Sequence, residues 1–227
     1  MLPRAGAYAA RMSSLDAVIQ SRRTTKVFAE SPDASVTTDR GQINELIAAA
    51  AWAPFHRPAN KVHLSGPHPS LVPWRFHAVD AAGCRVLRSK LIEAGDAGKL
   101  PQMLAAAECV IHCTWLPDSA RTDDPVPEGH LFEPTISNME HIAAAGAAIQ
   151  NLLLAATDRG FDSYWSSGGA LRGEQAFGWL GIPTEQILLG AIFLFPSEAD
   201  GTERVPGKLR EKRGADADWS RWVDLTD

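Results

Sequence analysis

The sequence SNMEHIAAAGAAIQNLLLAATDRG, residues 137–160, contains the longest helical pattern in the chain. Ser137 and Glu140 have the spacing of a capping box, which begins a helix, and Gly160 stands where a glycine commonly ends one. Apolar residues surround much of the predicted helix, so we expect it to be buried on more than one side. One face carries small side chains that let another helix approach closely: Ala143, Gly146 and Ala147.

Helical and strand patterns alternate on both sides of this segment. A helix is predicted from Ser14 into the basic residues that begin at Arg22, and apolar residues at helical spacing predict further helices at 37–53, 82–95, 96–107 and 173–182. Apolar runs predict strands at 74–80, 109–116, 186–196 and the start of 162–171, which ends in a Gly/Ser turn. No repeat or linker divides the chain, so these elements predict one α+β or α/β domain, residues 1–227, with a four-stranded sheet.

Composition limits the partners and the compartment. The formal net charge is −5, whereas nucleic acids and anionic membranes require a concentrated basic face, so neither is an expected partner. The cysteines are odd in number and lack CxxC spacing, which favours buried free thiols in a reducing cytoplasm: Cys84, Cys109 and Cys113. We find neither a secretory signal nor an apolar run of the roughly 18 residues that span a membrane.

Two short basic segments stand out in this acidic chain. The first is IQSRRTTKVF, residues 19–28, whose guanidinium forks, hydroxyl and ammonium group could bind a phosphate: Arg22, Arg23, Thr24 and Lys26. PGKLREKR, residues 206–213, contributes Lys208 and Arg210. Each segment taken alone also has an explanation without a ligand. The first could be a set of cations at the C-terminal end of a helix, and the second could be a solvated tail. Common phosphate-loop, dinucleotide, hydrolase and zinc motifs are absent from the sequence.

Four blocks in collinear order resemble the nitroreductase family of flavoproteins. SRRTTKVF resembles its R-R-S-x-R-x-F opening, and IAAAAWAPFH with VPWRFHAV resembles A-x-x-A-P-(S/D)-x followed by Q-P-W-x-F-x-V. AAAGAAIQNLLLAATDRGFDSYWSSG, the most specific block, resembles G-A-A-x-Q-N-L-L-L-A-A-x-x-x-G-L-x-S-x-W. ILLGAIFLFP and GKLR resemble the closing strand and the terminal K-x-R of the small one-domain branch.

The resemblance implies an α+β, nitroreductase-like three-layer sandwich, in which helices flank a central, mostly antiparallel sheet. Two chains would form an intertwined homodimer with FMN in two clefts at the interface, and the helix over 137–159 would lie in the dimer core. The N-terminal residues 1–12 are expected to form a flexible arm, and the polar, proline-rich segment 117–136 a surface lid. A C-terminal arm at 197–227 would embrace the partner with Trp219 and Trp222.

The resemblance also implies the residues that bind the flavin. The phosphate would be held by both basic segments: Arg22, Arg23, Thr24, Lys26, Lys208 and Arg210. His56 would lie near the ribityl chain or the phosphate. The turn against the isoalloxazine ring would consist of Trp165, Ser166, Ser167 and Gly168. His56 could equally be an exposed loop residue, and Trp165 could be an ordinary core residue.

Two departures from the family pattern concern the flavin ring. Val72 replaces the family's glutamine, often a contact of the pyrimidine edge, and Asn60 is the candidate that would replace this amide. The loop between His56 and Pro73 is also longer than the branch's usual spacing. The phosphate donors are retained, so we expect phosphate binding to be less affected than ring chemistry.

The function that the resemblance implies is ping-pong hydride transfer. NAD(P)H would reduce the flavin, and a nitroaromatic, quinone or enone would then reoxidise it in the same place, with no obligatory catalytic side chain and no metal. The segment 117–136 would cover the pocket and set substrate choice. Two alternatives stay open, a flavin-storage protein with little turnover and a flavin-fragmenting or dehalogenating enzyme on the same fold.

Overall fold

The computed structural model describes residues 14–65, 68–118, 131–198 and 201–225. The arm predicted at 1–12 and residues 119–130 of the predicted lid lie outside these ranges. No helix of the described part is long and apolar enough to cross a bilayer.

The predicted four-stranded sheet is confirmed, and every neighbouring pair in it is antiparallel. Its order is β2-β3-β5-β4, and its strands are β2 (Trp74–Asp80), β3 (Cys109–Trp115), β5 (Ile187–Phe195) and β4 (Asp162–Ser166). All seven residues of β3 are buried, as expected for a continuous apolar run in a central strand that is covered on both faces.

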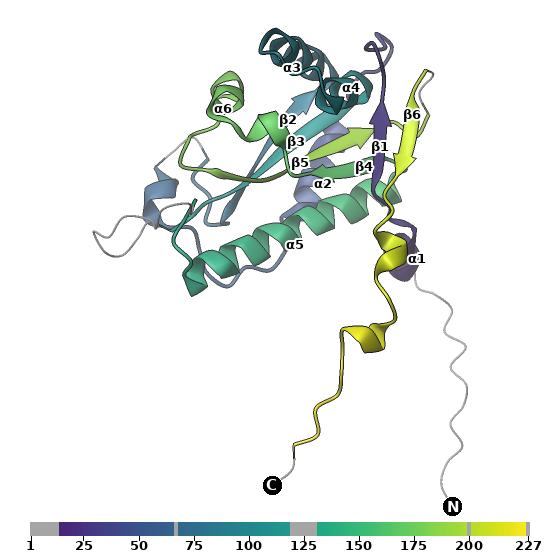
Figure 1. The fold of residues 1–227 in the computed structure, drawn as a ribbon. Coiled ribbons are helices and arrows are strands. Elements are labelled where there is room, and N and C mark those ends of the chain that lie inside the picture. Colours follow the sequence, from purple (N-terminus) through teal and green to yellow (C-terminus); the bar gives the residue numbers. More distant parts are fainter. Residues whose placement is uncertain (1–13, 66–67, 119–130, 199–200, 226–227) are drawn as a thin grey trace, which may run out of the picture.

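Helices cover both faces of this sheet, which confirms the three-layer architecture (Figure 1). One face carries α3 (Ala81–Glu93), α4 (Lys99–Ala106) and α6 (Glu174–Leu180). The other carries α2 (Arg40–Ala50) and α5 (Ile136–Asp158). Alternate side chains of the strands therefore enter two separate cores, with Ile111 and Ile192 on the side of α5 and Val110 and Phe193 on the side of α3 and α4.

The long helix begins earlier than its sequence pattern predicted. Thr135 is the N-cap, and its side chain accepts a hydrogen bond from the Asn138 N–H, so the predicted capping box of Ser137 and Glu140 is wrong. Both side chains have partners outside the helix, because the Ser137 hydroxyl donates to Asp118 and Glu140 accepts from Arg57. The predicted lid thus ends at Thr135, since Ile136 already belongs to α5.

The end of α5 is as predicted. Gly160 has a φ of +81°, its N–H donates to the Thr157 carbonyl at 3.1 Å, and the Phe161 N–H donates to the Ala156 carbonyl at 3.0 Å. This pair of bonds is a Schellman motif, which requires the left-handed conformation that glycine adopts without strain.

A second, two-stranded sheet was not predicted. The strands β1 (Thr25–Phe28) and β6 (Glu203–Pro206) pair antiparallel, from Thr25 opposite Pro206 to Phe28 opposite Glu203. Thr24 also forms a parallel bridge with Ser163 of β4. The helix α1 (Ser14–Ser21) therefore ends before the basic residues, and the small sheet lies beside the β4 edge of the main sheet (Figure 1).

Four short 3-10 helices complete the described elements: Lys61–Leu64, Gly169–Arg172, Arg210–Lys212 and Asp216–Asp218. The three cysteines are free and buried, as predicted.

One buried histidine makes the fold sensitive to acid. His112 on β3 is fully buried, and neither ring nitrogen has a hydrogen-bond partner among the residues that the structure describes. Burial, and secondarily the charge of His77, lowers its pKa to about 4. The folded pKa lies below the ordinary value of about 6.5, so the stability that neutral His112 contributes is complete above that value and is lost as the pH falls toward 4.

We therefore expect the His112→Leu variant to lose less stability in acid than the unmodified protein. The difference in unfolding free energy between pH 7 and pH 4 should shrink by about 3 kcal/mol, measured by urea unfolding at a fixed protein concentration. Ile111→Val on the same strand provides the control, since it removes a buried methylene but no titratable group and should lower the stability equally at both pH values. An unaltered acid response of the His112 variant would contradict this assignment.

Candidate functional site

The fold brings the two basic segments together. Arg210 donates through Nη1 to the carbonyl oxygen of Arg22 at 2.5 Å and through Nη2 to the carbonyl oxygen of Gln20. The N–H of Gly207 donates to the Thr24 carbonyl at 2.8 Å. The β1–β6 ladder is the cause of this convergence, because it sets the residue after β6 beside the residue before β1.

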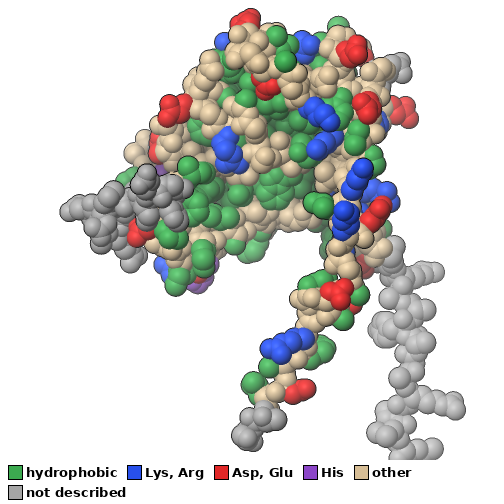
Figure 2. Space-filling view, viewed as in Figure 1, with side chains coloured by type: hydrophobic (Ala, Val, Ile, Leu, Met, Phe, Trp, Pro, Cys, Tyr) green, Lys and Arg blue, Asp and Glu red, His purple; other side chains and the backbone are tan. Residues whose placement is uncertain are grey.

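Three guanidinium groups crowd at this junction. The pKa of Arg22 is lowered, first by burial and then by the charges of Arg210 and Arg213. The charges of Arg210 and Arg213 lie close enough to Arg22 to repel its guanidinium, so an anion placed among them would be stabilised. Arg23 and Lys208 are exposed nearby, and Figure 2 shows Lys and Arg side chains gathered where the C-terminal segment leaves the body, at the border of an apolar area.

Lys26 is oriented differently from the arginines. Its Nζ lies 4.9 Å from the centroid of the Tyr164 ring on β4. The cation thus stacks on an aromatic face, and it connects the basic segment to the strand that leads into the predicted flavin turn.

The turn after β4 has the backbone geometry of a close-approach site. Gly168 has a φ of +107°, and a Cβ there would lie 2.6 Å from a Leu188 methyl group, so the position requires glycine. The Ser166 hydroxyl accepts the Gly168 N–H at 3.1 Å, while Ser167 is exposed. Because Thr24 bridges Ser163, this turn begins within one short strand of the basic cluster.

Trp165 is only partly a core residue. Its side chain is 36% exposed, and it passes beside Gly190 of β5, where a Cβ would lie 2.1 Å from the indole Nε1. The missing side chain of Gly190 therefore creates the space in which the indole lies. Trp165 presents one part of its ring to solvent on the α5 side of the sheet.

His56 does not join the basic cluster within one chain. It is exposed after α2, and the neighbouring Arg57 donates to Glu140, near the N-terminal end of α5, at 2.6 Å. The basic cluster lies instead beside β4, which follows the C-terminal end of α5. The helix between Glu140 and Asp158 separates the two places by about 27 Å, at about 1.5 Å per residue.

Val72 and Asn60, the candidates for the pyrimidine edge of the flavin, are also distant in sequence from the basic cluster, and both have local hydrogen-bond partners. Val72 is half-buried, and its carbonyl accepts from Arg75 Nη1 at 2.8 Å. Asn60 caps a 3-10 helix, because its Oδ1 accepts the Val62 N–H at 3.2 Å.

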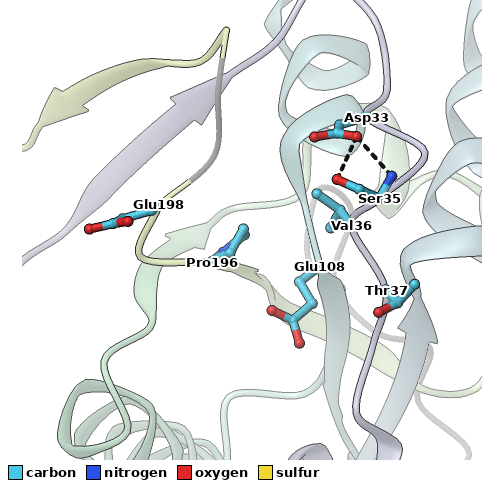
Figure 3. Close-up of a pocket in the computed structure, with 7 residues that line it drawn as sticks. All are labelled: Asp33, Ser35, Val36, Thr37, Glu108, Pro196 and Glu198. Atoms are coloured by element: carbon cyan, nitrogen blue, oxygen red, sulfur yellow. Dashed lines mark hydrogen bonds between the residues drawn. The ribbon is translucent and has the colours of Figure 1, made fainter.

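A cavity of about 430 Å³ lies elsewhere and has the wrong charge for a phosphate (Figure 3). Asp33, Glu108 and Glu198 line it. Asp33 accepts hydrogen bonds from Ser35, and burial, the main cause, raises the pKa of Glu108. The cavity contains none of the residues that the sequence indicated.

Some residues of the site were missed. Arg213 lay within the quoted segment PGKLREKR, so its charge was a usable signal, although its proximity to Arg22 was not. Gly190 and Ser163 stand within the blocks that resemble the family, but the local sequence does not indicate their roles, since these depend on pairing between strands that are distant in sequence.

Comparison with known proteins places this geometry in context. The family model described as "Nitroreductase family" matches residues 19–194. A nitroreductase of Lactococcus lactis, solved with nicotinic acid, is 16% identical with a TM-score of 0.58, and the alignment covers 93% of this chain and 100% of that one. A nitroreductase of Bacteroides fragilis with bound FMN is 18% identical with a TM-score of 0.54, over 93% and 100%.

A nitroreductase-like protein of Bacillus cereus is 19% identical with a TM-score of 0.57, over 89% of this chain and 96% of that one. No match was found among curated proteins. At these identities the solved structures establish similarity of fold.

Substitution of Gly190 tests the packing of Trp165. A Cβ at Gly190 would lie 2.1 Å from the indole and 2.9 Å from the Ser166 carbonyl oxygen, so Gly190→Ala should lower the unfolding free energy by about 1–3 kcal/mol. Adding Trp165→Ala to that variant should recover part of the loss in a double-mutant cycle.

Gly178 of α6 provides the matched control. A Cβ there meets nothing within 4 Å, so Gly178→Ala should be neutral or stabilise by up to about 1 kcal/mol. Equal stabilities of the two alanine variants would show that the indole does not occupy this space.

Proposed function

Because this chain belongs to the nitroreductase family, we propose that it is an FMN-dependent oxidoreductase. It uses NAD(P)H to reduce small nitroaromatic, quinone or enone-type acceptors. The observation that carries the proposal is the convergence of Arg22, Arg210 and Arg213 at the junction of two distant segments.

The cluster suits a phosphate dianion. The three arginines repel one another when the site holds no anion, and their guanidinium groups provide forked donors that match phosphate oxygens. Arg210 uses two of its N–H groups on backbone carbonyls, which fixes its orientation and leaves others to donate. Arg22, Arg23, Thr24, Lys208 and Arg210 would hold the phosphate, and the Bacteroides fragilis relative of the same fold contains FMN.

The rest of the flavin would extend from the cluster along β4. Trp165 would flank it on the α5 side of the sheet, and Lys26, which stacks on Tyr164 at the opposite face of β4, would contribute its charge from there. The backbone of Ser166, Ser167 and Gly168 would face the ring, because Gly168 leaves that backbone free of a Cβ. The bound flavin would supply the hydride chemistry, whereas the protein would orient the ring and set its electrostatic surroundings. Nicotinamide and acceptor would occupy the same place in turn, which gives ping-pong kinetics.

A homodimer would complete this site. The outer face of α5 is largely apolar and only partly covered in the described chain: Ile136, Met139 and Ala143 are exposed, and Gly146 and Ala147 are half-buried. Trp219 and Trp222, 67% and 97% exposed, lie on the segment that projects from the body (Figure 1). A second copy that packs on α5 would cover these groups, and its His56 would reach the flavin that the first copy's His56 cannot.

We place the enzyme in the cytoplasm, where free thiols persist. Cys84, Cys109 and Cys113 are all free and buried. The segment 117–136 would cover the pocket and set substrate choice.

The phosphate assignment predicts a selective loss of affinity. Arg22→Gln and Lys208→Gln should each weaken FMN binding by about 10- to 100-fold, since a hydrogen bond to a charged group contributes about 1.5–3 kcal/mol. Riboflavin, which has the same ring without the phosphate, should bind the variants as it binds the unmodified protein. Fluorescence titration of the flavin-free protein measures both constants.

Lys90 on α3 is the control cation. It stacks over Trp179 on the other side of the sheet, so Lys90→Gln should leave FMN affinity unchanged. If Arg22→Gln reduced riboflavin and FMN affinity equally, the cluster would not be the phosphate site.

The activity is tested on the purified, FMN-loaded protein. Under anaerobic conditions NADH or NADPH should bleach the flavin absorption, and a nitroaromatic or a quinone should restore it, with parallel double-reciprocal plots in the steady state. A protein that binds FMN but is not reduced would be the storage protein, and breakdown products of flavin or release of halide would identify the other alternative.

The dimer has its own test. Ala143→Glu places a charge on the exposed face of α5 and should shift the sedimentation coefficient from dimer to monomer, with weaker FMN binding. Ala82→Glu on α3, an exposed position on the opposite layer, should leave the dimer intact. If the unmodified protein were a monomer and bound FMN at a ratio of one to one, a flavin site shared by two chains would be excluded.

A further inference from the structure

A buried arginine outside the proposed flavin-phosphate site has no counter-ion. Arg75 on β2 is 7% exposed, and it makes no ion pair with any residue that the structure describes. Its Nη1 donates to the Val72 and Trp74 carbonyls at 2.8 and 2.7 Å, and its Nη2 donates to the Ser70 carbonyl at 3.0 Å. These acceptors are neutral, so the guanidinium charge itself is not compensated, and a buried charge without a partner is costly.

The charge lies against a small polar cavity. Arg75, Gln186 and His63 are among the residues that line this cavity of about 120 Å³. Glu185 stands at its wall as well, but its side chain is exposed and does not pair with Arg75. A cavity with a buried cation and amide on one side favours a ligand with acceptor oxygens.

Gln186 contributes donors to this cavity. Its side chain is 9% exposed, and its Oε1 accepts from the Thr114 hydroxyl at 2.6 Å and interacts with His77 Nε2 at 2.9 Å. These two contacts fix the amide with its oxygen occupied. The amide nitrogen, which makes no hydrogen bond within the described chain, carries two N–H donors that remain for a ligand.

A second, apolar cavity adjoins the first. It measures about 200 Å³ and shares Arg75 and His68 with the polar cavity, while Ile47, Val72, Trp74 and Phe76 line the rest. Both cavities are smaller than the roughly 300–1,000 Å³ of pockets for drug-sized ligands. The occupant must therefore be small, with one anionic end and one apolar end.

We propose that Arg75 and Gln186 form a binding site for a small monocarboxylate whose apolar group enters the neighbouring cavity. Arg75 supplies the charge and Gln186 a neutral donor to the carboxylate, a pairing that compensates the buried guanidinium. The site is separate from the basic cluster of Arg22, Arg210 and Arg213, which the β1–β6 pairing creates. It requires no flavin, so it stands or fails independently of the proposed activity.

The test uses benzoate as the probe and benzamide as its neutral isostere. Calorimetric titration and thermal unfolding of the purified, FMN-loaded protein are recorded at constant pH and ionic strength. We expect benzoate to bind and to raise the melting temperature with increasing concentration, because a ligand of the folded state stabilises it. Benzamide should do neither.

Three single substitutions of similar size locate the site. Gln186→Glu keeps an acceptor for Thr114 and His77 and places a carboxylate beside Arg75, so it should raise the melting temperature and abolish benzoate binding. Arg75→Lys keeps the charge but loses the fork, and it should weaken benzoate by about tenfold. Glu185→Gln removes a like charge from the cavity wall and should retain or improve binding.

Several results would overturn the proposal. Equal behaviour of benzoate and benzamide would show that charge is not recognised, and undiminished benzoate binding by Gln186→Glu would place the probe elsewhere. A benzoate-induced change in the flavin spectrum of equal size in all variants would assign the probe to the flavin.

Discussion

The pairing of β1 with β6 is the constraint on which the functional site depends. It joins residues near the two ends of the chain, and closing such a large loop costs conformational entropy that local contacts cannot offset. The ladder is short, but it is anchored by the Thr24–Ser163 bridge to the edge of the main sheet and by Val27 and Phe28, which are buried in the core beside α3 and α4. The position of the two basic segments therefore depends on the main sheet to which the ladder is anchored.

This arrangement places like charges together at a cost to the folded chain. Arg22 is half-buried next to Arg210 and Arg213, and its lowered pKa reflects that environment. β1 and β6 pair through their backbones, and Arg210 ties the C-terminal segment to two carbonyl oxygens, but neither role needs the charges of Arg22 and Arg213 at this corner. A cluster that destabilises the free chain and is relieved by an anion has the character of a binding site, whereas ion pairs such as Arg204 with Asp162 serve the fold itself.

The sequence predicted the parts of the molecule that depend on local or periodic patterns. The buried run of β3, the Schellman glycine of α5 and the Gly/Ser turn after β4 were all readable, because apolar periodicity and backbone sterics act over a few residues. β1 and β6 were not readable, since short polar strands acquire their conformation from a partner distant in sequence. The role of Gly190 could not be predicted for the same reason, since its missing side chain matters only because Trp165 of a different strand lies beside it. The role of Arg75 could not be predicted either, since its lack of a carboxylate partner is a property of the folded chain.

The length of α5 links the two halves of the proposed site. One end of the helix lies near His56, through Arg57 and Glu140, and the other end leads into β4 and the basic cluster. A two-fold dimer axis pairs the same surface of both chains. If the axis crosses the middle of α5, the two helices pack antiparallel, and the His56 end of each chain comes beside the basic end of the other. The small residues Ala143, Gly146 and Ala147 lie between these ends, where close approach of the helices has to occur. In that arrangement a second copy would supply the residue that one chain cannot deliver to its own phosphate site, and the same packing would cover the apolar face of α5 that the single chain leaves open.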